Sequence, residues 1–171
     1  MRFLIGFALA VSLSQAAFAG PMDDLTDAQQ KVFDAWQNVL LTQRKVLLLA
    51  TPSTGYGMYS ERTSNVFKSG DKIFTYVEPL GYGWKNLSGG MFEMNFVTDL
   101  VMKAENGDVV VDQKAFATNV LQSHEANMEF SMDFTLTLTE APVGKYKIEY
   151  TIHDISSRQD STFDQDIVVA D

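Results

Sequence analysis

Residues 128–139 alternate between apolar and polar side chains without a break, and this pattern constrains the fold more strongly than any other part of the chain. The apolar positions are Met128, Phe130, Met132, Phe134, Leu136 and Leu138. Successive side chains of a β-strand point to opposite faces of a sheet, so the pattern predicts a strand with one buried and one solvated face. A second alternating segment covers residues 145–152, and the turn residues Pro142 to Gly144 predict an antiparallel hairpin between the two.

A second hairpin is predicted around Asn106-Gly107, because this dipeptide readily adopts the positive φ values that tight turns need. Its strands are expected from Phe92 to Met102 and from Val109 to Phe116. Further strands are expected at 46–50, 72–78 and 163–169, which gives about seven in all. No helical pattern lies between the strands, so βαβ folds are disfavoured. The sequence therefore predicts a mainly β fold, an antiparallel β-sandwich of two sheets.

An amphipathic helix is expected before the strands. Thr26 and Gln29 fit a capping box, in which each side chain satisfies a backbone amide of the first turn, so we expect the helix to begin there. Arg44 and Lys45 would suit its C-terminal end. Apolar residues recur on one face at three- and four-residue spacing, at Val32, Phe33, Trp36, Val39 and Leu40. The other face lacks the basic residues of a membrane-surface helix, so we expect the apolar face to pack on the β domain.

The first nineteen residues have the features of a cleavable secretory signal peptide. Arg2 supplies a positive charge, residues 3–13 are apolar but too short to span a bilayer, and the end, Ala17 to Ala19, fits a small-residue cleavage site. Cleavage after Ala19 is expected, with an uncleaved anchor helix as the alternative. We thus expect an exported protein, periplasmic or secreted, with a helical segment at 20–45 packed on a β-sandwich domain at 46–171.

Charge and composition limit the kinds of partner that this chain is expected to bind. The net charge is −9, and loss of the signal peptide removes one positive charge to give −10. This balance disfavours nucleic acid and anionic lipid as partners. Cysteine is absent, so the chain cannot be anchored as a lipoprotein through a cysteine and needs no disulfide. No cofactor is expected. An envelope protein, a peptide or a glycan is the expected kind of partner, without stable membrane insertion after cleavage, and the oligomeric state is left open.

Several segments, most of them in the middle of the chain, resemble segments of other proteins. These segments are Gly55-Tyr56-Gly57, Asn65 to Asp71, and Tyr76 to Trp84, followed by Gly144 to Tyr146 near the C-terminus. In this order they resemble uncharacterised exported bacterial proteins with an immunoglobulin-like β-sandwich, over most of residues 50–170. The resemblance implies export and an immunoglobulin-like fold. It brings no substrate and no catalytic residue.

Two segments that combine glycines with large aromatic residues, 55–59 and 81–84, are predicted loops. Glycine lets the backbone turn sharply, and the rings offer flat faces to a sugar, a peptide or another protein. The candidate ligand-binding surface consists of Tyr56, Tyr59, Glu61, Arg62, Tyr82, Trp84 and Lys85. It requires that both loops lie at the same end of the sandwich. The alternative is that the aromatic residues close the end of the core or pack under the N-terminal helix.

No catalytic residue and no metal ligand is predicted. Ser69 and Lys72 have the spacing of Ser-x-x-Lys enzymes, but they precede a strand and the partner motifs are missing. His124 and His153, the two histidines, lack companions with ligand spacing and are expected on the surface. The sequence therefore favours a non-catalytic binding or structural module of the bacterial cell envelope. The alternative is a small hydrolase or metal-dependent enzyme that uses carboxylates and the two histidines.

Asp160, Asp164 and Asp166 do not have the spacing of a calcium loop, and Asp164 and Asp166 are expected to point outward from the last strand. Either this strand or residues 46–50 can lie at a sheet edge. Since an open edge can pair with another chain, self-assembly is a third possibility.

Overall fold

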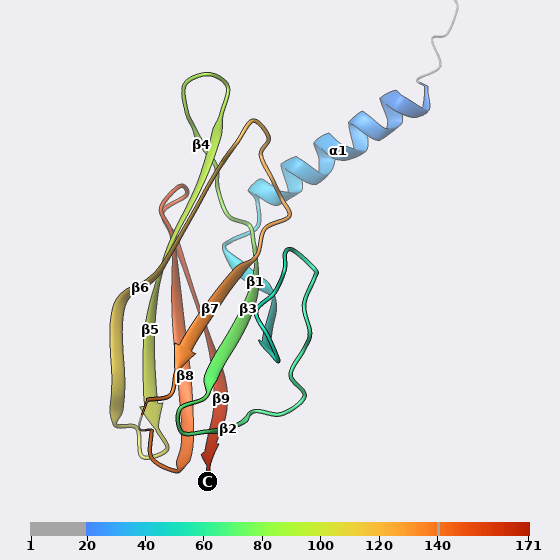
Figure 1. The fold of residues 1–171 in the computed structure, drawn as a ribbon. Helices are drawn as coiled ribbons and strands as arrows, with labels where there is room; N and C mark the ends of the chain where they lie inside the picture. The colour runs from blue at the N-terminus through green and yellow to red at the C-terminus, as the bar shows by residue number, and fades with distance from the viewer. Residues whose placement is uncertain (1–19, 140) are drawn as a thin grey trace, which may run out of the picture. The chain divides into compact units, whose positions relative to one another are not determined.

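The computed structural model describes residues 20–139 and 141–171. The predicted signal peptide, residues 1–19, lies outside the described residues. The chain divides into a unit that ends at Phe33 and a unit from Asp34 to Asp171, and each is described by itself. Within the described residues there are one helix and nine strands (Figure 1), so the prediction of a mainly β fold with an N-terminal helix is confirmed.

Helix α1 spans Pro21–Gln37 and so begins before Thr26. Pro21 occupies the first helical position, and the N–H of Gly20 donates to the Asp23 carboxylate over 2.9 Å. Proline and acidic side chains both favour the first turn of a helix, which explains the earlier start. The Thr26 hydroxyl instead donates to a carbonyl one turn earlier, so the capping-box prediction was wrong. The packing of residues 21–33 on the β domain stays a prediction.

The strands form two sheets. They are β1 (Thr42–Leu49), β2 (Val66–Lys68), β3 (Lys72–Leu80), β4 (Lys85–Asn86), β5 (Phe92–Ala104), β6 (Val109–Ser123), β7 (Met132–Thr137), β8 (Gly144–Asp154) and β9 (Gln159–Ala170). The small sheet has the order β1-β3-β7. The large sheet has the order β2-β9-β8-β5-β4, and β6 pairs with the other edge of β5. All pairs are antiparallel except β2 with β9.

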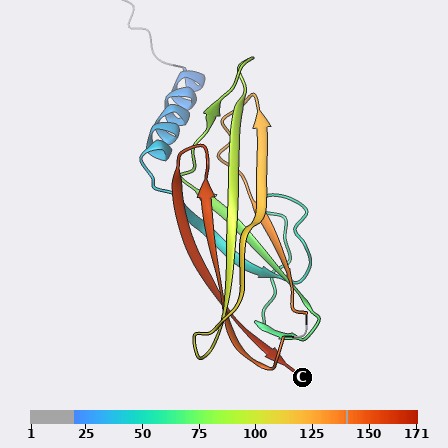
Figure 2. The ribbon, with the colours of Figure 1, turned by 90° about the vertical axis from the view of Figure 1, so that its left-hand side faces the viewer.

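Both sheets are curled and contribute their inner faces to one core (Figures 1 and 2). The Phe134 ring of β7 stacks on Tyr150 of β8, with 5.2 Å between ring centroids. Ile73 and Val77 of β3 point into this core, whereas Tyr76 between them points to the outer face. The period of two that is visible in the sequence thus sets which side chains are buried.

One predicted hairpin is confirmed and the other was wrong. β5 and β6 pair around Asn106-Gly107, where Gly107 has a φ of 89°. β7 pairs with β3 in the small sheet, however, while β8 pairs with β5 and β9 in the large one. The chain therefore crosses between sheets after β7, because alternation fixes the face of a strand but not its neighbour. The predicted strand at 128–139 shrinks to β7, since Met128 and Phe130 pack against the core from a loop.

The ends of the chain also differ from expectation. Arg44 and Lys45, expected at the end of the helix, lie in β1. β1 is an edge strand, and the C-terminal strand β9 is one in part, because it pairs with β8 along its length but with β2 only at residues 168–170. Asp164 and Asp166 of β9 are exposed, as predicted, and Asp160 is exposed too.

Candidate functional site

A long loop, residues 50–62, leaves β1 and lies on the outer face of the small sheet. Its base is closed by two backbone hydrogen bonds, from Ala50 N–H to the Ser60 carbonyl (2.9 Å) and from Arg62 N–H to the Leu48 carbonyl (2.7 Å). Its middle is held by the Tyr76 hydroxyl, which accepts a hydrogen bond from the Gly57 N–H over 2.8 Å. Long loops in compact domains are usually either functional or disordered, and loop 50–62 is held in place by these bonds, so it is a candidate recognition element.

The tip of loop 50–62 is a tight turn. Gly55 and Met58 form an isolated bridge, and Gly57 between them has a φ of 70°, which favours glycine. Ser53 ties the loop to β7, because its hydroxyl donates to the Asp133 carboxylate over 2.6 Å. The Met58 side chain is 57% exposed at this fixed tip, and Tyr56 is half-buried.

Glu78 lies beneath loop 50–62 and is only 3% exposed. Its carboxylate accepts hydrogen bonds from the Tyr76 hydroxyl (2.9 Å) and from the Arg44 guanidinium (3.0 Å), and the Lys45 ammonium lies 3.7 Å away. A β-bulge explains why two consecutive cations reach one carboxylate. Gln43 pairs with Pro79 and Lys45 with Glu78, so Arg44 is an inserted residue in the register of β1 and β3.

The two cations also contact the tyrosines of loop 50–62. The Arg44 guanidinium lies 5.5 Å from the centre of the Tyr56 ring, within the range of a cation–π contact. The Lys45 ammonium donates to the Tyr59 hydroxyl over 2.7 Å, and this hydrogen bond raises the pKa of Lys45 above 10.5. The Tyr59 ring in turn packs 4.8 Å from Tyr76. These contacts form one network on the outer face, which we call the Glu78 network. It consists of Arg44, Lys45, Tyr56, Tyr59, Tyr76 and Glu78.

The second predicted loop has a different position. Tyr82 is 1% exposed and its ring contacts Phe96 at 5.5 Å, so it lies in the core and not on a surface. Trp84 is partly buried and stacks on Trp36, with 5.8 Å between ring centroids. The Tyr82 hydroxyl and the Trp84 indole N–H both donate to the Asn127 carbonyl, over 2.8 and 3.1 Å. Burial raises the pKa of Tyr82.

The aromatic contacts of Tyr56 and Tyr59 described here share no residue with those of Tyr82 and Trp84. The geometry of residues 81–84 matches the alternative reading, in which aromatic side chains close the core. Glu61 and Lys85 are exposed. The partly buried Arg62 guanidinium lies 4.3 Å from the centre of the Phe67 ring and donates to backbone carbonyls, which fixes the end of loop 50–62.

Sequence reasoning missed three residues that position these loops. Arg44 and Glu78 were missed because a bulge cannot be read from alternation, although a carboxylate inside the apolar run of β3 was a usable signal. Asp154 was missed as well, and it is 1% exposed. Its carboxylate accepts hydrogen bonds from the Gly83 N–H (2.7 Å) and from the Ser157 hydroxyl (2.5 Å), which fixes the 81–84 loop.

His153 lies on the outer face of the large sheet between two carboxylates. Its Nδ1 is 2.7 Å from Asp160 and its Nε2 is 3.2 Å from Asp99. The hydrogen bond with Asp160 is the main cause that raises the pKa of His153 above 6.5. The hydrogen bond from the Ala115 N–H, followed by that from Lys114, lowers the pKa of Asp99 to about 2. Within residues 20–139 and 141–171, no three His, Cys, Asp or Glu side chains gather in a way that would hold a metal ion.

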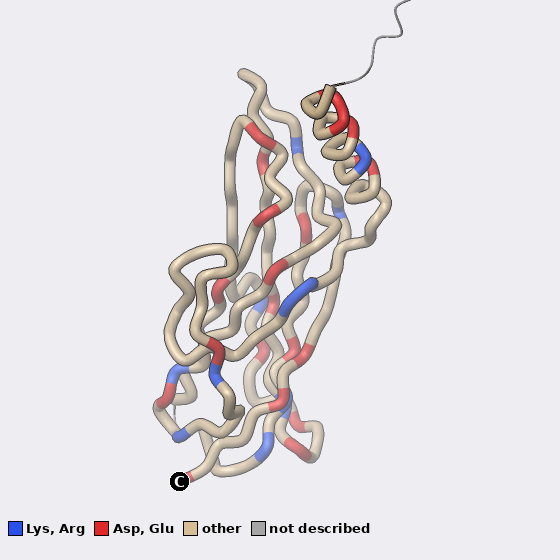
Figure 3. Tube along the Cα trace, turned by 90° about the vertical axis from the view of Figure 1, so that its right-hand side faces the viewer, with Lys and Arg blue, Asp and Glu red and all other residues tan. Residues whose placement is uncertain are grey.

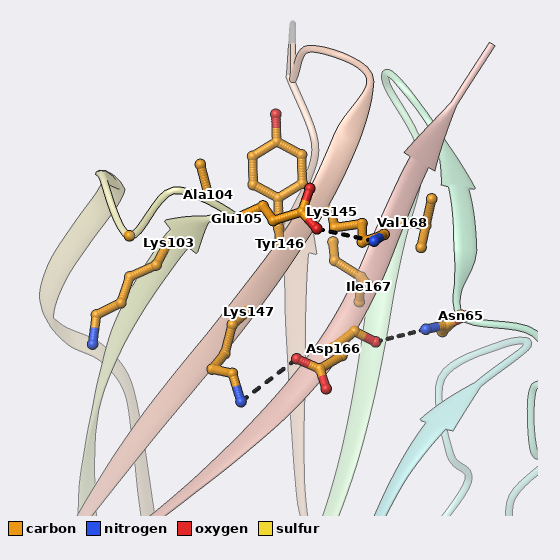
Figure 4. Close-up of a pocket in the computed structure, with 11 residues that line it drawn as sticks. Asn65, Lys103, Ala104, Glu105, Lys145, Tyr146, Lys147, Asp166, Ile167 and Val168 are labelled. Carbon is orange, nitrogen blue, oxygen red and sulfur yellow. Dashed lines mark hydrogen bonds and ion pairs between the residues drawn. The ribbon is translucent and has the colours of Figure 1, made fainter.

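A shallow pocket of about 530 Å³ lies on the same outer face, near the β5–β6 turn (Figure 4). Its charges neutralise one another across the strands. Lys145 donates to Glu105 over 2.9 Å, and Lys147 lies 3.6 Å from Asp166 and also contacts Asp164. Figure 3 shows the same mixing of acidic and basic residues along the strands. A pocket with internally paired charges offers no net attraction to a charged ligand.

Comparisons with known proteins assign no family. No family model matches the chain, and no curated protein is similar to it. Among solved structures, the sporulation control protein Spo0M from Bacillus subtilis aligns at 10% sequence identity with a TM-score of 0.41. The alignment covers 78% of this chain and 50% of that one, so the chain spans half the length of Spo0M. A similarity of this extent assigns neither a fold family nor an activity.

Proposed function

We propose that this protein is an exported, non-catalytic binding module of the bacterial cell envelope, and that loop 50–62 is its recognition surface. The observation that carries this proposal is the Glu78 network. It holds a long loop in one conformation although the loop contributes little to the core. A loop that is ordered before binding loses less conformational entropy on association, which favours affinity.

The chemistry of loop 50–62 suits a protein, peptide or glycan partner. Met58 at the tip is adaptable and apolar, and Tyr56 presents an amphipathic ring beside the Arg44 guanidinium, whose side chain is 47% exposed. Tyrosine and arginine are enriched among the residues that contribute most to binding. Tyr59 and Arg62 position the loop, while Glu61 and Lys85 are exposed charges. Tyr82 and Trp84 support the core in this proposal and do not contact the partner.

Export and fold type are further parts of the proposal. Residues 1–19 would direct the chain across the inner membrane, as their charge, apolar length and cleavage pattern indicate. None of the described residues forms a helix with the length and apolar character needed to cross a bilayer. We also propose that the two curled sheets are a variant of an immunoglobulin-like sandwich, and that the chain belongs with the exported bacterial proteins that its middle segments resemble.

A site-specific crosslinking experiment tests the recognition surface. The full chain is produced in bacterial cells with a photo-crosslinking amino acid at position 58. The matched control carries the same amino acid at position 143, where Val143 is 62% exposed in another loop. We expect a defined crosslinked product from position 58 alone, and we expect Tyr56→Ala to reduce it several-fold. Equal products from both positions, or a product that Tyr56→Ala leaves unchanged, would contradict the proposal.

The alternative, a small hydrolase or metal-dependent enzyme, depends on the histidines. Both ring nitrogens of His153 are occupied by aspartates, and neither contacts a hydroxyl that would act as nucleophile. A general base needs a free ring nitrogen within hydrogen-bond reach of the group it deprotonates. An activity screen with esters, glycosides and phosphoesters distinguishes the two functions. Turnover that His153→Gln abolishes would favour the enzyme, and binding without turnover would favour the module.

A further inference from the structure

The second half of β6, residues 117–123, is an open sheet edge. β6 pairs with β5 along one side, and none of the described strands pairs with its other side. Figure 2 shows this part of β6 in light orange beside β5, with its outer side free of strands. An edge strand presents unpaired N–H and carbonyl groups, which can continue the sheet into another chain.

A bulge separates this edge from the first half of β6. Thr98 pairs with Ala117 and Leu100 with Gln113, so residues 114–116 stand opposite Asp99 alone. Ala115 has a φ of 49°, and its N–H donates to the Asp99 carboxylate over 2.9 Å. Bulges increase the local twist and turn an edge away from a flat pairing geometry. The first half of β6 also carries charged residues, whereas residues 117–123 carry none.

The other sheet edges, among them residues 159–165 of β9 with the charged Asp160 and Asp164, are protected in ways that 117–123 is not. β1 carries Arg44 and Lys45, and residues 60–62 cover its end. β2 has three residues and β4 has two, which is too short for stable pairing. β7 has six residues and ends in a crossing between sheets. Charged residues, short strands and covering loops are the usual means by which proteins block edge pairing. Their absence from 117–123 singles out this edge.

We propose that residues 117–123 pair antiparallel with the same residues of a second copy of this chain, about a two-fold axis at Val120. In this register Val120 lies beside Val120 of the partner subunit, and each Thr118 lies beside a Gln122. Val120 is 53% exposed in the single chain, so the pairing buries an apolar side chain twice. Cross-strand neighbours on one face of a sheet are the contacts that stabilise such a pair.

Charge favours a second copy as the occupant. The register brings Lys114, which already pairs with Asp99 over 2.9 Å, toward Glu125 of the partner subunit, so that one ammonium faces two carboxylates at each end. No like charges meet within 117–123, although the whole chain is acidic with a net charge of −9. The remaining repulsion acts over longer distances and is screened at moderate salt, where the Debye length is about 8 Å.

The oligomeric state tests this proposal. We expect light scattering of the full chain without its signal segment to give twice the monomer mass at high protein concentration, with dissociation on dilution. Val120→Lys should shift the mass to the monomer, because two ammonium groups would meet at the axis. Val143→Lys, a change of the same kind at an exposed loop residue, should leave the dimer intact. Circular dichroism checks that each variant is folded, and Thr118→Lys replaces Val120→Lys if that variant is not.

The absence of cysteine allows a second test of the register. Val120→Cys with a short bis-maleimide should give a covalent dimer, and a mixture of Thr118→Cys with Gln122→Cys should give a mixed one. Val143→Cys should give neither. A monomer at every concentration and salt level, a dimer that Val120→Lys leaves unchanged, or equal crosslinking from positions 120 and 143 would each overturn the proposal.

Discussion

The Glu78 carboxylate is 3% exposed and lies between two cations whose side chains remain partly in water. A buried ion pair contributes little net stability compared with an apolar pair, because removing the charges from water is costly. The ion pair instead fixes the positions of the side chains around it, since loss of one partner leaves the others without their hydrogen bonds. Glu78 therefore determines where Arg44, Lys45 and Tyr76 point, and with them where loop 50–62 lies.

Replacing Glu78 with glutamine should destabilise the protein by about 1–3 kcal/mol, the range for a buried polar group that loses its partner. The amide keeps one acceptor oxygen but offers no charge to Arg44. Urea unfolding measures the free energy. Glu105→Gln is the control, because the Glu105–Lys145 pair is 69% exposed on both sides and exposed pairs contribute little. Equal effects of the two substitutions would contradict the role of Glu78.

A second residue-scale prediction concerns His153. Its pKa is raised above 6.5 in the folded chain, mainly by the hydrogen bond with Asp160. Folding thus favours the protonated ring. The resulting stabilisation is fully present below the ordinary pKa and is lost as the pH rises through the raised one. In a His124→Gln background, one imidazole remains for titration by nuclear magnetic resonance. We expect a midpoint above 6.5 that Asp160→Asn lowers, and a midpoint at or below 6.5 would disprove it.

At the scale of elements, local signals predicted the strands but not all of their partners. The Asn106-Gly107 turn predicted the β5–β6 pair because the turn itself sets the register. Pro142 to Gly144 is also turn-like, but the chain uses it to cross between sheets. Tyr82 and Trp84 were read as a surface because aromatic residues suit both cores and interfaces. Only the tertiary contacts with Trp36, Phe96 and Asn127 distinguish the two.

Two glycines on either side of β4 offer a matched pair of substitutions, since Gly81 lies between β3 and β4 and Gly89 between β4 and β5. Gly81 and Gly89 have φ values of 75° and 74°, which side chains rarely adopt. A Cβ at Gly81 would lie 2.6 Å from the Val39 carbonyl oxygen, whereas a Cβ at Gly89 meets nothing within 4 Å. Gly89→Ala should therefore cost only the backbone strain, about 1–2 kcal/mol.

Gly81→Ala carries the same strain and an additional clash with backbone that cannot move aside easily. Thermal unfolding should show a markedly larger loss of stability for Gly81→Ala than for Gly89→Ala. If the two variants melt at the same temperature, the close approach of residues 39 and 81 is not tight in solution.

At the scale of the whole second unit, the two sheets share one hydrophobic core. Side chains from β6, β7 and β8 meet in it, as the contacts of Phe116 with Phe134 and Tyr150 show. Neither sheet can expose its inner face without exposing that of the other. This arrangement predicts a single cooperative unfolding transition.

Two spectroscopic probes test this cooperativity. The chain has two tryptophans, Trp36 and Trp84, and both lie in the aromatic cluster around Tyr82. Their fluorescence reports on that end of the core, while far-ultraviolet circular dichroism reports on all strands. The two urea transitions should coincide in midpoint and slope. A fluorescence transition at clearly lower urea would show that the tryptophan end opens separately.

The parallel pair of β2 and β9 has a consequence for how the chain reaches this structure. Val66 pairs with Val168, and Lys68 with Ala170, so β2 cannot pair until residues 102 positions later in the chain have been made. Closing so long a loop is slow, and unpaired strands are exposed until it happens. Whether the chain leaves a ribosome or a membrane channel from its N-terminus, the large sheet is complete only after residues 168–170 have emerged.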